Sequence, residues 1–171
     1  MTSTAAEAIK TGLPAVADAD TQLFILGSLP GDASLHAERY YAHPGNQFWR
    51  LLGGAIGEAL QPLDYAARLD VLARRRIGLW DVIGSARRRG SLDQAIRDAD
   101  HNPLGVLLTD FPELRAIAFN GATAAAAGRR LLAGHAQSLT LIDLPSSSAA
   151  HAIVFAAKAE RWAALGQFSG R

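Results

Sequence analysis

Short apolar runs alternate with segments of helical periodicity along most of this chain. The apolar runs have the length of buried strands and lie at residues 23–28, 78–83, 116–120 and 139–143. Apolar side chains at helical spacing predict helices over residues 47–60, 64–75, 121–132 and 149–165. Strands that alternate with helices favour a mostly parallel sheet covered on both faces. The sequence therefore predicts an α/β fold with three α/β/α layers and a central, mostly parallel four-stranded sheet.

Two shorter helices are predicted from their first residues. Ser91 is typical of an N-cap and predicts a short helix that ends at Ile96. Asn102 and Pro103 combine an N-cap with proline at the first helical position, which predicts a helix over residues 104–110.

Length and composition indicate one domain. The chain has 171 residues, enough to bury a substantial core. Residues 1–20 are rich in Ala and Thr and lack the basic start and apolar block of a signal peptide. We therefore expect a flexible lead-in over residues 1–20 and a single domain over residues 21–171. No uninterrupted apolar stretch reaches the ~18–20 residues that a membrane span needs, so no membrane partner is expected.

The absence of cysteine excludes several classes of site, whereas the net charge does not settle whether the chain binds nucleic acid. The absence of cysteine excludes disulfides, thiolate zinc sites and cysteine-ligated iron–sulfur clusters, and it fits a cytoplasmic protein. The five histidines show no metal-ligand spacing, so we expect no metal and no cofactor. The net charge of +1 does not by itself indicate a nucleic-acid binder. Arginines nevertheless cluster at residues 74–76, 87–89 and 129–130, either as solvated helix ends or as a local basic face for phosphate.

The loops after the predicted strands are rich in Gly, Pro, Ser and Asn. They lie at residues 27–31, 80–81, 120–121 and 144–148. The carboxyl ends of parallel strands share one edge of the sheet, where ligands bind in open α/β folds. A further run at residues 40–49 places two tyrosines, a histidine and an asparagine before a predicted helix. Ordinary turn chemistry explains any one of these loops, but their joint placement favours a pocket for a flat polar ring.

Three of these segments resemble motifs of the uracil-DNA glycosylase superfamily, in order and in spacing. They are Gly-Ser-Leu-Pro-Gly at residues 27–31, Tyr-Ala-His-Pro-Gly-Asn-Gln-Phe-Trp at residues 41–49, and Leu-Pro-Ser-Ser-Ser-Ala at residues 144–149. The segments 78–83 and 119–121 also fit, and the likeness extends from about Leu23 to Trp162. The chain is most similar to the hypoxanthine-DNA (deoxyinosine) glycosylase branch of that superfamily.

The resemblance implies a monofunctional DNA repair glycosylase without a cofactor. Such an enzyme flips a deaminated base out of double-stranded DNA, a step that costs a few kcal/mol. It then hydrolyses the N-glycosidic bond with water and leaves an abasic site. The resemblance implies hypoxanthine as the base, double-stranded DNA with a damaged or mispaired base as the partner, and a monomer as the active form.

The resemblance also implies a set of site residues. Many members carry an acid or amide inside the first motif, where this chain has Leu29, and the hypoxanthine branch uses a later asparagine, here Asn46. A carboxamide oxygen can accept a hydrogen bond from water and orient it. The base pocket would be formed by Gly27, Ser28, Leu29, Pro30, Tyr41, His43, Asp81 and Asn120. The DNA backbone would contact Pro145, Ser146, Ser147 and Ser148.

Individual roles within this set have alternatives. Tyr41 suits a platform on which the base stacks, although tyrosine is also common in cores. Asp81 suits the N1–H group of hypoxanthine, or else it caps the next segment. Asn46 is also a good helix N-cap, and His43 and Asn120 are equally compatible with purely structural roles.

Two other functions remain compatible with the sequence. One is a glycosylase of the same superfamily that acts on uracil or on G·U and G·T mismatches, because the loop at residues 144–149 also looks like the thymine-mismatch branch. Leu144 stands where some uracil enzymes have a histidine, which argues against efficient uracil-specific action. The other is a non-catalytic nucleic-acid-binding domain of the same fold, which the aliphatic Leu29 keeps open.

Overall fold

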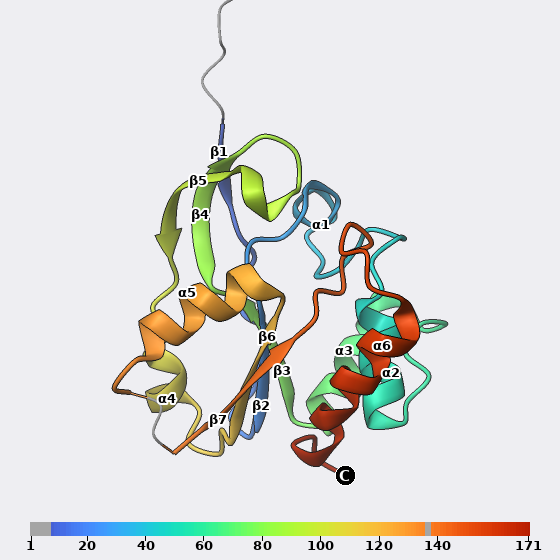
Figure 1. The fold of residues 1–171 in the computed structure, drawn as a ribbon. Helices are drawn as coiled ribbons and strands as arrows, with labels where there is room; N and C mark the ends of the chain where they lie inside the picture. Colours follow the sequence, from blue (N-terminus) through green and yellow to red (C-terminus); the bar gives the residue numbers. More distant parts are fainter. Residues whose placement is uncertain (1–7, 136–137) are drawn as a thin grey trace, which may run out of the picture.

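A computed structural model describes residues 8–135 and 138–171 (Figure 1). The strands are β1 (Ile9–Thr11), β2 (Leu23–Gly27), β3 (Ile77–Asp81), β4 (Ile83–Arg88), β5 (Ile96–His101), β6 (Ala116–Asn120) and β7 (Thr140–Leu144). The helices are α1 (Asp32–Ala37), α2 (Phe48–Ile56), α3 (Tyr65–Arg74), α4 (Val106–Asp110), α5 (Ala122–Leu132) and α6 (Phe155–Trp162). Two 3₁₀ turns, η1 (Asp93–Ala95) and η2 (Ala163–Gln167), complete the described elements.

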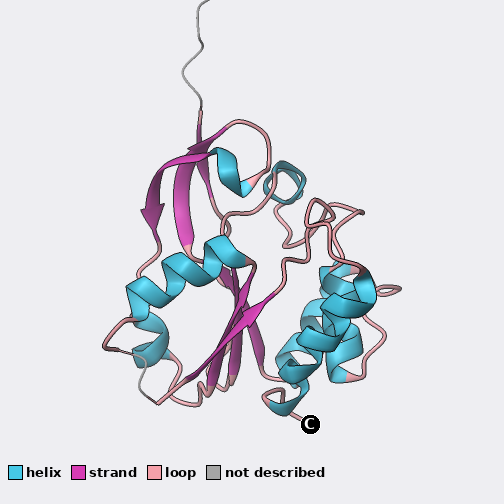
Figure 2. Cartoon of the chain, in the orientation of Figure 1, coloured by secondary structure: helices cyan, strands magenta, loops and turns pink. Residues whose placement is uncertain are grey.

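The central sheet has four parallel strands in the order β3-β2-β6-β7. Helices α2, α3 and α6 cover one face, and α4 and α5 cover the other (Figure 2). The predicted three-layer α/β/α fold is thus confirmed, and the four strand-like runs all contribute to its central sheet.

Strand β2 shows why the sheet is buried on both faces. Its residues Leu23 and Ile25 pack with α2, α3 and α6, whereas Phe24 and Leu26 pack with α4 and α5. Successive side chains of a strand point to opposite faces, so a strand covered on both sides must be apolar at every position. All five residues of β2 are buried.

A second sheet, which the sequence analysis does not predict, has three antiparallel strands in the order β1-β4-β5. The apolar run at residues 78–83 divides between β3 and β4, and only Val82 separates the two strands. The short helix expected from Ser91 to Ile96 is only the 3₁₀ turn η1, which Ser91 does not cap, and Ile96 already begins strand β5. Both β4 and β5 are largely polar, because only a small apolar cluster lies beneath them.

The expectation of a flexible lead-in over residues 1–20 is wrong from residue 8 onward, and residues 1–7 lie outside the described residues. Strand β1 pairs with β4, and Val16 exchanges two backbone hydrogen bonds with Leu79. The apolar Ile9 of β1 is 62% exposed, so the strand lacks the alternation of buried apolar and exposed polar residues that would reveal the pairing.

The helix predicted over residues 149–165 begins only at Phe155, since residues 145–154 form the loop that follows β7. The short helix α1 was not predicted. Among the described residues, no helix has the length and apolar character needed to cross a membrane.

Candidate active site

The strand-end loops lie together at one edge of the central sheet, as predicted. Gly27 ends β2 beside Asp81 at the end of β3, because the two strands pair in register at these residues. A Cβ atom on Gly27 would lie 2.6 Å from Asp81 Oδ1 and 3.2 Å from the Tyr41 hydroxyl. A side chain at position 27 would therefore displace both polar groups. Because glycine has no side chain, the Asp81 carboxyl group and the Tyr41 hydroxyl can both lie close to position 27.

A chain of hydrogen bonds joins four residues of this cluster. Asn120 Nδ2 donates to the Tyr41 hydroxyl at 3.3 Å and to Ser147 Oγ at 2.9 Å. Ser147 Oγ in turn donates to Asn46 Oδ1 at 2.8 Å, and the Ser147 amide donates to Asn120 Oδ1 at 2.9 Å. Asn120 thus connects the Tyr41 segment with the loop after β7. Side-chain and backbone hydrogen bonds thus join three of the sequence-predicted loops.

The side chain of Asn46 is hydrogen-bonded through its oxygen but not through its nitrogen among the described residues. Its Oδ1 accepts hydrogen bonds from the Phe48 amide at 3.0 Å and from Ser147. Two donors fill the two lone pairs of a carboxamide oxygen. The Nδ2 group donates to no other group within the part of the chain that the structure describes. From the sequence we expect the oxygen to hold water, but in this arrangement the groups of Asn46 that remain unused are the two donor hydrogens on Nδ2.

Tyr41 is held in an unusual conformation. Its φ of 54° lies in the left-handed region, which costs energy for a bulky residue and is found disproportionately at functional sites. The ring stacks on Phe48 with centroids 3.7 Å apart and an interplanar angle of 5°. Trp49 Nε1 donates to the Tyr41 carbonyl at 3.2 Å, so α2 fixes both the backbone and the ring. Burial raises the pKa of the Tyr41 hydroxyl, which therefore stays protonated.

Asp81 carries a buried atom without a partner. The residue is 4% exposed, and its Oδ2 has no hydrogen-bond partner. Burial, aided by the negative charge of Asp93 and opposed by Arg88, raises the pKa of Asp81 to about 7. Unsatisfied buried polar atoms are rare in native proteins and call for an explanation. A ligand that donates a hydrogen bond to Asp81 Oδ2 would explain why this atom has no partner within the protein.

The second sheet holds the loop at residues 27–31 in place. Arg88 of β4 is 1% exposed and donates to the carbonyls of Leu29 at 3.2 Å and Pro30 at 2.7 Å. Ser28 Oγ donates to Asp93 Oδ1 at 2.5 Å. The side chain of Leu29 packs with Ile83 and Ala86 in the core of the second sheet. The Leu29 side chain thus anchors the loop, and its place in the base pocket stays a prediction.

Replacing Arg88 by methionine should lower the free energy of unfolding by about 3 kcal/mol or more. The substitution leaves buried carbonyl groups without donors, and each such group costs about 1–3 kcal/mol. Chemical denaturation at pH 7 measures the change. The neighbouring Arg87→Met is the control, since Arg87 is partly exposed and its ion pair with Asp98 is a surface pair. Equal stability of the Arg88 variant and the wild type would contradict this role.

The loop after β7 directs its carbonyl groups toward α6. Trp162 Nε1 donates to the Pro145 carbonyl at 2.9 Å, and Lys158 Nζ donates to the Ser148 carbonyl at 3.1 Å. The amide groups of Ser146 and Ala149 donate to no partner among the described residues. Ser147 is buried and engaged internally, so of the three serines only Ser146 and Ser148 are partly exposed.

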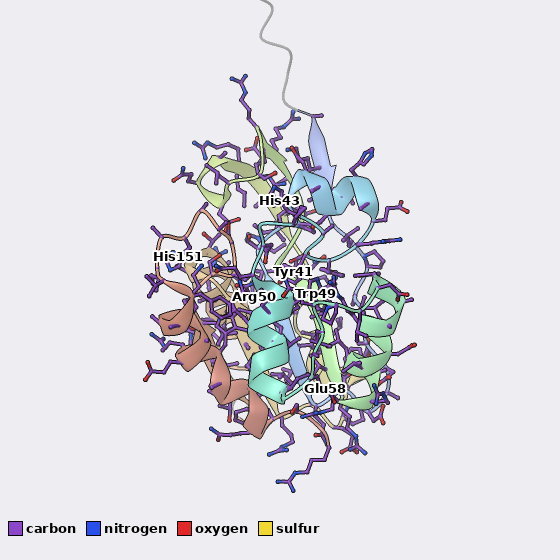
Figure 3. All side chains as sticks on the ribbon, turned by 90° about the vertical axis from the view of Figure 1, so that its right-hand side faces the viewer. Tyr41, His43, Trp49, Arg50, Glu58 and His151 are labelled. Carbon is purple, nitrogen blue, oxygen red and sulfur yellow. The ribbon has the colours of Figure 1, made fainter. Side chains whose placement is uncertain are left out.

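His43 lies apart from the hydrogen-bonded cluster. It is exposed, and its Nδ1 accepts from the Gly45 amide at 2.9 Å. Figure 3 shows His43 and Tyr41 near the first turn of α2, with His151 on the neighbouring loop. The structure thus brings together Gly27, Tyr41, Asp81 and Asn120 but leaves His43 at the periphery.

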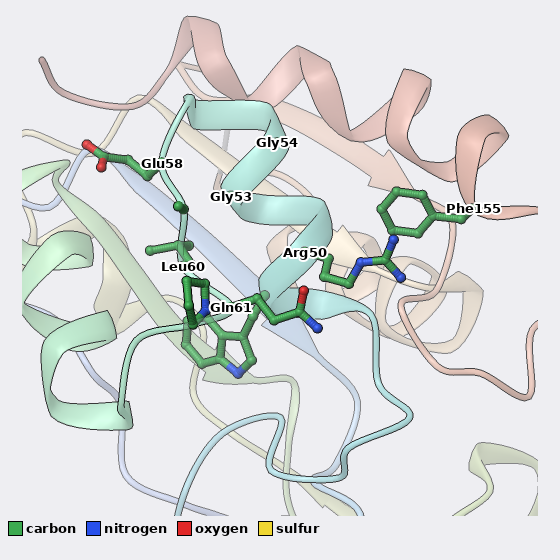
Figure 4. Close-up of a pocket in the computed structure, with 10 residues that line it drawn as sticks. Arg50, Gly53, Gly54, Glu58, Leu60, Gln61 and Phe155 are labelled. Atoms are coloured by element: carbon green, nitrogen blue, oxygen red, sulfur yellow. The ribbon is translucent and has the colours of Figure 1, made fainter.

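A separate hollow of about 340 Å³ lies beside α2 (Figure 4). Its lining includes Arg50, Gly53, Glu58 and Phe155 and none of the cluster residues. No group of three or more potential metal ligands occurs among residues 8–135 and 138–171.

Three residues that support the site were not found from the sequence. Arg88 stands in a run of arginines, Asp93 follows a turn, and Lys158 occupies an amphipathic helix. Each of these patterns is typical of a solvated surface. The only available signal was the clustering of arginines at residues 87–89, which does not say that the middle one is buried.

Comparisons with known proteins agree with this geometry. Residues 14–166 match the family described as the uracil DNA glycosylase superfamily. A hypoxanthine DNA glycosylase from Methanosarcina barkeri is 49% identical over 112 residues, which cover 66% of this chain and 71% of that protein. A protein of the same name from Methanosarcina acetivorans is 50% identical over 113 residues, covering 66% and 72%.

Among solved structures, a similar fold occurs in the solution NMR structure of a protein from M. acetivorans described as a "putative Uracil DNA glycosylase". The TM-score is 0.83 at 43% sequence identity, and the match covers 94% of this chain and 98% of the other.

Proposed function

Because this chain belongs to the uracil DNA glycosylase superfamily, we propose that it is a hypoxanthine DNA glycosylase that excises the base of deoxyinosine. The proposal is carried by the two relatives named hypoxanthine DNA glycosylase, which are 49% and 50% identical to this chain over 66% of its length. We further propose that it acts as a monomer on double-stranded DNA and that its single catalytic domain consists of residues 21–171 together with the preceding segment that carries β1 and Val16.

The reaction adds water across the N-glycosidic bond. The hydroxyl oxygen of water joins the anomeric carbon, and the proton finally resides on the released hypoxanthine. Glycosidic bonds break through a sugar with oxocarbenium character, so the enzyme must place water beside that carbon. Asn46 is the residue proposed for this task, since its Nδ2 group is free while its oxygen is fixed by Phe48 and Ser147. Asparagine is not a strong base, so slow turnover is expected.

Recognition of the base is assigned to Tyr41 and Asp81. Tyr41 stands beside Gly27 and Asp81 with its ring fixed by Phe48, an arrangement that suits stacking of an extruded base. The unpartnered Oδ2 of Asp81 suits the N1–H donor of hypoxanthine. The ionised carboxylate would also disfavour adenine, because adenine presents a lone pair at N1. Asn120 positions Tyr41 and Ser147 through its hydrogen bonds.

The loop at residues 145–148 is proposed to bind the DNA backbone. The free amides of Ser146 and Ala149, together with the Ser146 and Ser148 hydroxyls, are suitable donors for phosphate oxygens. Ser147 has a different role in this proposal, because its amide and hydroxyl already hold Asn120 and Asn46.

A panel of labelled duplexes tests the proposed activity. Each duplex carries a single inosine, uracil, G·U pair, G·T pair or xanthine, and alkali converts abasic sites into strand breaks. We expect cleavage at inosine to be fastest by about 100-fold or more, since a site built to hydrogen-bond its substrate rejects poor matches strongly.

The other two functions give different results in the same assay. Cleavage only at uracil or at G mismatches would assign the chain to the uracil-directed or mismatch-directed type. Tight binding without any abasic product would identify a non-catalytic DNA-binding domain.

A further inference from the structure

Lys158 is a buried cation without an acidic partner. It lies on α6 and is 1% exposed. Its Nζ donates to Gln47 Oε1 at 3.0 Å and to the Ser148 carbonyl at 3.1 Å, so two of its three protons are engaged. No carboxylate lies within 4.0 Å of Nζ in the described part of the chain. Burial lowers the pKa of this amine, as expected for a cation removed from water.

The two oxygens that Lys158 contacts belong to the two segments of the site. Gln47 directly follows Asn46, and Ser148 directly follows Ser147. The same two segments also meet through the Gln47 amide, which donates to the Ser147 carbonyl at 2.9 Å, and through the Ser147–Asn46 hydrogen bond. The ammonium therefore lies beneath the junction of the loop at residues 145–148 with the segment that carries Asn46.

Neutral oxygens compensate a buried charge only in part. Removing an ion from water carries a large penalty, which an opposite charge can offset. Among the described residues no carboxylate provides this charge, whereas the loop that Lys158 contacts through the Ser148 carbonyl carries the free amides proposed to bind a DNA phosphate. Attraction between two charges is also stronger where water is excluded.

We propose that Lys158 is a positioning residue and that a DNA phosphate bound on the loop at residues 145–148 compensates its positive charge. Because Lys158 contacts both this loop and Gln47, phosphate binding and the placement of Asn46 are then coupled. The inference rests on the proposed function only in that the anion is a phosphate of DNA. It does not depend on which base is removed.

Binding of modified duplexes tests whether Lys158 and a bound phosphate interact. The duplex carries a tetrahydrofuran abasic analogue, and each phosphate near it is replaced in turn by an uncharged methylphosphonate. The wild type should lose about 10-fold in affinity at one phosphate, the scale of one charge-assisted contact. Lys158→Met should already bind the unmodified duplex about 10-fold more weakly and should then lose at most about 2-fold at that phosphate.

Arg161→Met is the matched control, since it removes a positive charge from the exposed side of the same helix. It should retain the full loss at the sensitive phosphate. If Lys158→Met also retains that loss, the proposal is wrong. Thermal denaturation shows whether each variant is folded, and the wild-type assay on inosine duplexes tests the enzyme assignment separately.

A measurement on the unmutated protein covers the case in which Lys158→Met does not fold. The ¹⁵N signal of the Lys158 amine should shift when the abasic duplex binds, and the shift should vanish with the methylphosphonate at the sensitive position. An identical shift with both duplexes would overturn the proposal.

Discussion

Replacing Asn46 by alanine is expected to reduce single-turnover excision of hypoxanthine by at least about 100-fold, the usual effect of losing one positioned polar group at a reacting centre. The free Nδ2 group that we assign to the attacking water disappears in this variant. Binding to an abasic duplex should change little, because Asn46 itself is not a proposed phosphate contact and the contacts of Lys158 with Gln47 and Ser148 remain in the variant. Rapid-quench kinetics on an inosine duplex measures the rate.

Loss of stability alone must be separated from loss of chemistry. The alanine variant also loses the bond from the Phe48 amide, which should cost about 1 kcal/mol as at other helix starts. Asp64→Ala is a matched control, since Asp64 Oδ1 accepts from the Ala67 amide at the start of α3 and lies outside the cluster. It should lose similar stability and keep full activity. An Asn46→Ala enzyme that cuts at the wild-type rate would exclude Asn46 from the mechanism.

The variant Asn46→Asp identifies the atom that acts. It retains an oxygen for the Phe48 and Ser147 donors and replaces the free donor nitrogen by an acceptor. A rate as low as that of alanine would show that the Nδ2 donors hold the water. Retained activity would instead assign the role to an acceptor, as the sequence analysis expects.

Replacing Asp81 by asparagine is expected to stabilise the protein at alkaline pH while it impairs excision. The pKa of Asp81 is about 7 in the folded chain and near 3.8 when unfolded. The native state therefore binds the extra proton between these values, and the contribution of Asp81 to stability is lost as the pH rises from about 4 to about 7. The neutral variant avoids this loss and should gain up to about 4 kcal/mol at pH 8, with no gain near pH 3.

The activity of the Asp81 variant should change in the opposite direction. If the ionised carboxylate accepts from hypoxanthine, wild-type kcat/KM rises with pH through about 7, and Asp81→Asn lowers it by about 10- to 100-fold. Urea denaturation and steady-state kinetics between pH 5 and 8.5 measure the two effects. Asp143→Asn, at an exposed position of β7, is the control and should alter neither profile. An unchanged pH dependence of stability in Asp81→Asn would contradict the burial argument.

The central sheet was predictable because its signal is local. Strand β2 is apolar at every position, and the helices around it repeat apolar side chains at helical spacing. Parallel strand ends must share an edge, so the meeting of Gly27, Asp81 and Asn120 followed from the fold class alone. The assignment of chemistry to these residues came from the family resemblance, not from periodicity.

The second sheet and its contribution to the site were not predictable in this way. Strands β4 and β5 bury too few apolar side chains to show an alternating pattern. Leu29 resembles a pocket residue in the sequence, yet it faces the small core under that sheet. Arg88 contacts Pro30, which lies 58 positions earlier in the sequence, and Lys158 contacts Gln47, which lies 111 positions earlier. The burial of both side chains depends on such distant contacts. Neither composition nor spacing carries that information.

Asn46 illustrates why the alternatives at a single position need not exclude one another. The sequence presents it either as a helix cap or as a catalytic group. In the structure its oxygen accepts from the first turn of α2, and its nitrogen remains free. The hydrogen bonds to Oδ1 fix the orientation of the carboxamide, and this orientation leaves Nδ2 available for the attacking water.

Mass-spectrometric analysis of the small products released from an inosine duplex shows whether the protein cleaves the N-glycosidic bond and whether Asn46 is needed for it. We predict free hypoxanthine in amounts equal to the abasic sites formed, and none above background with Asn46→Ala. Release of the intact nucleoside, or strand breaks without free base, would contradict a glycosylase. So would equal release of hypoxanthine by the alanine variant.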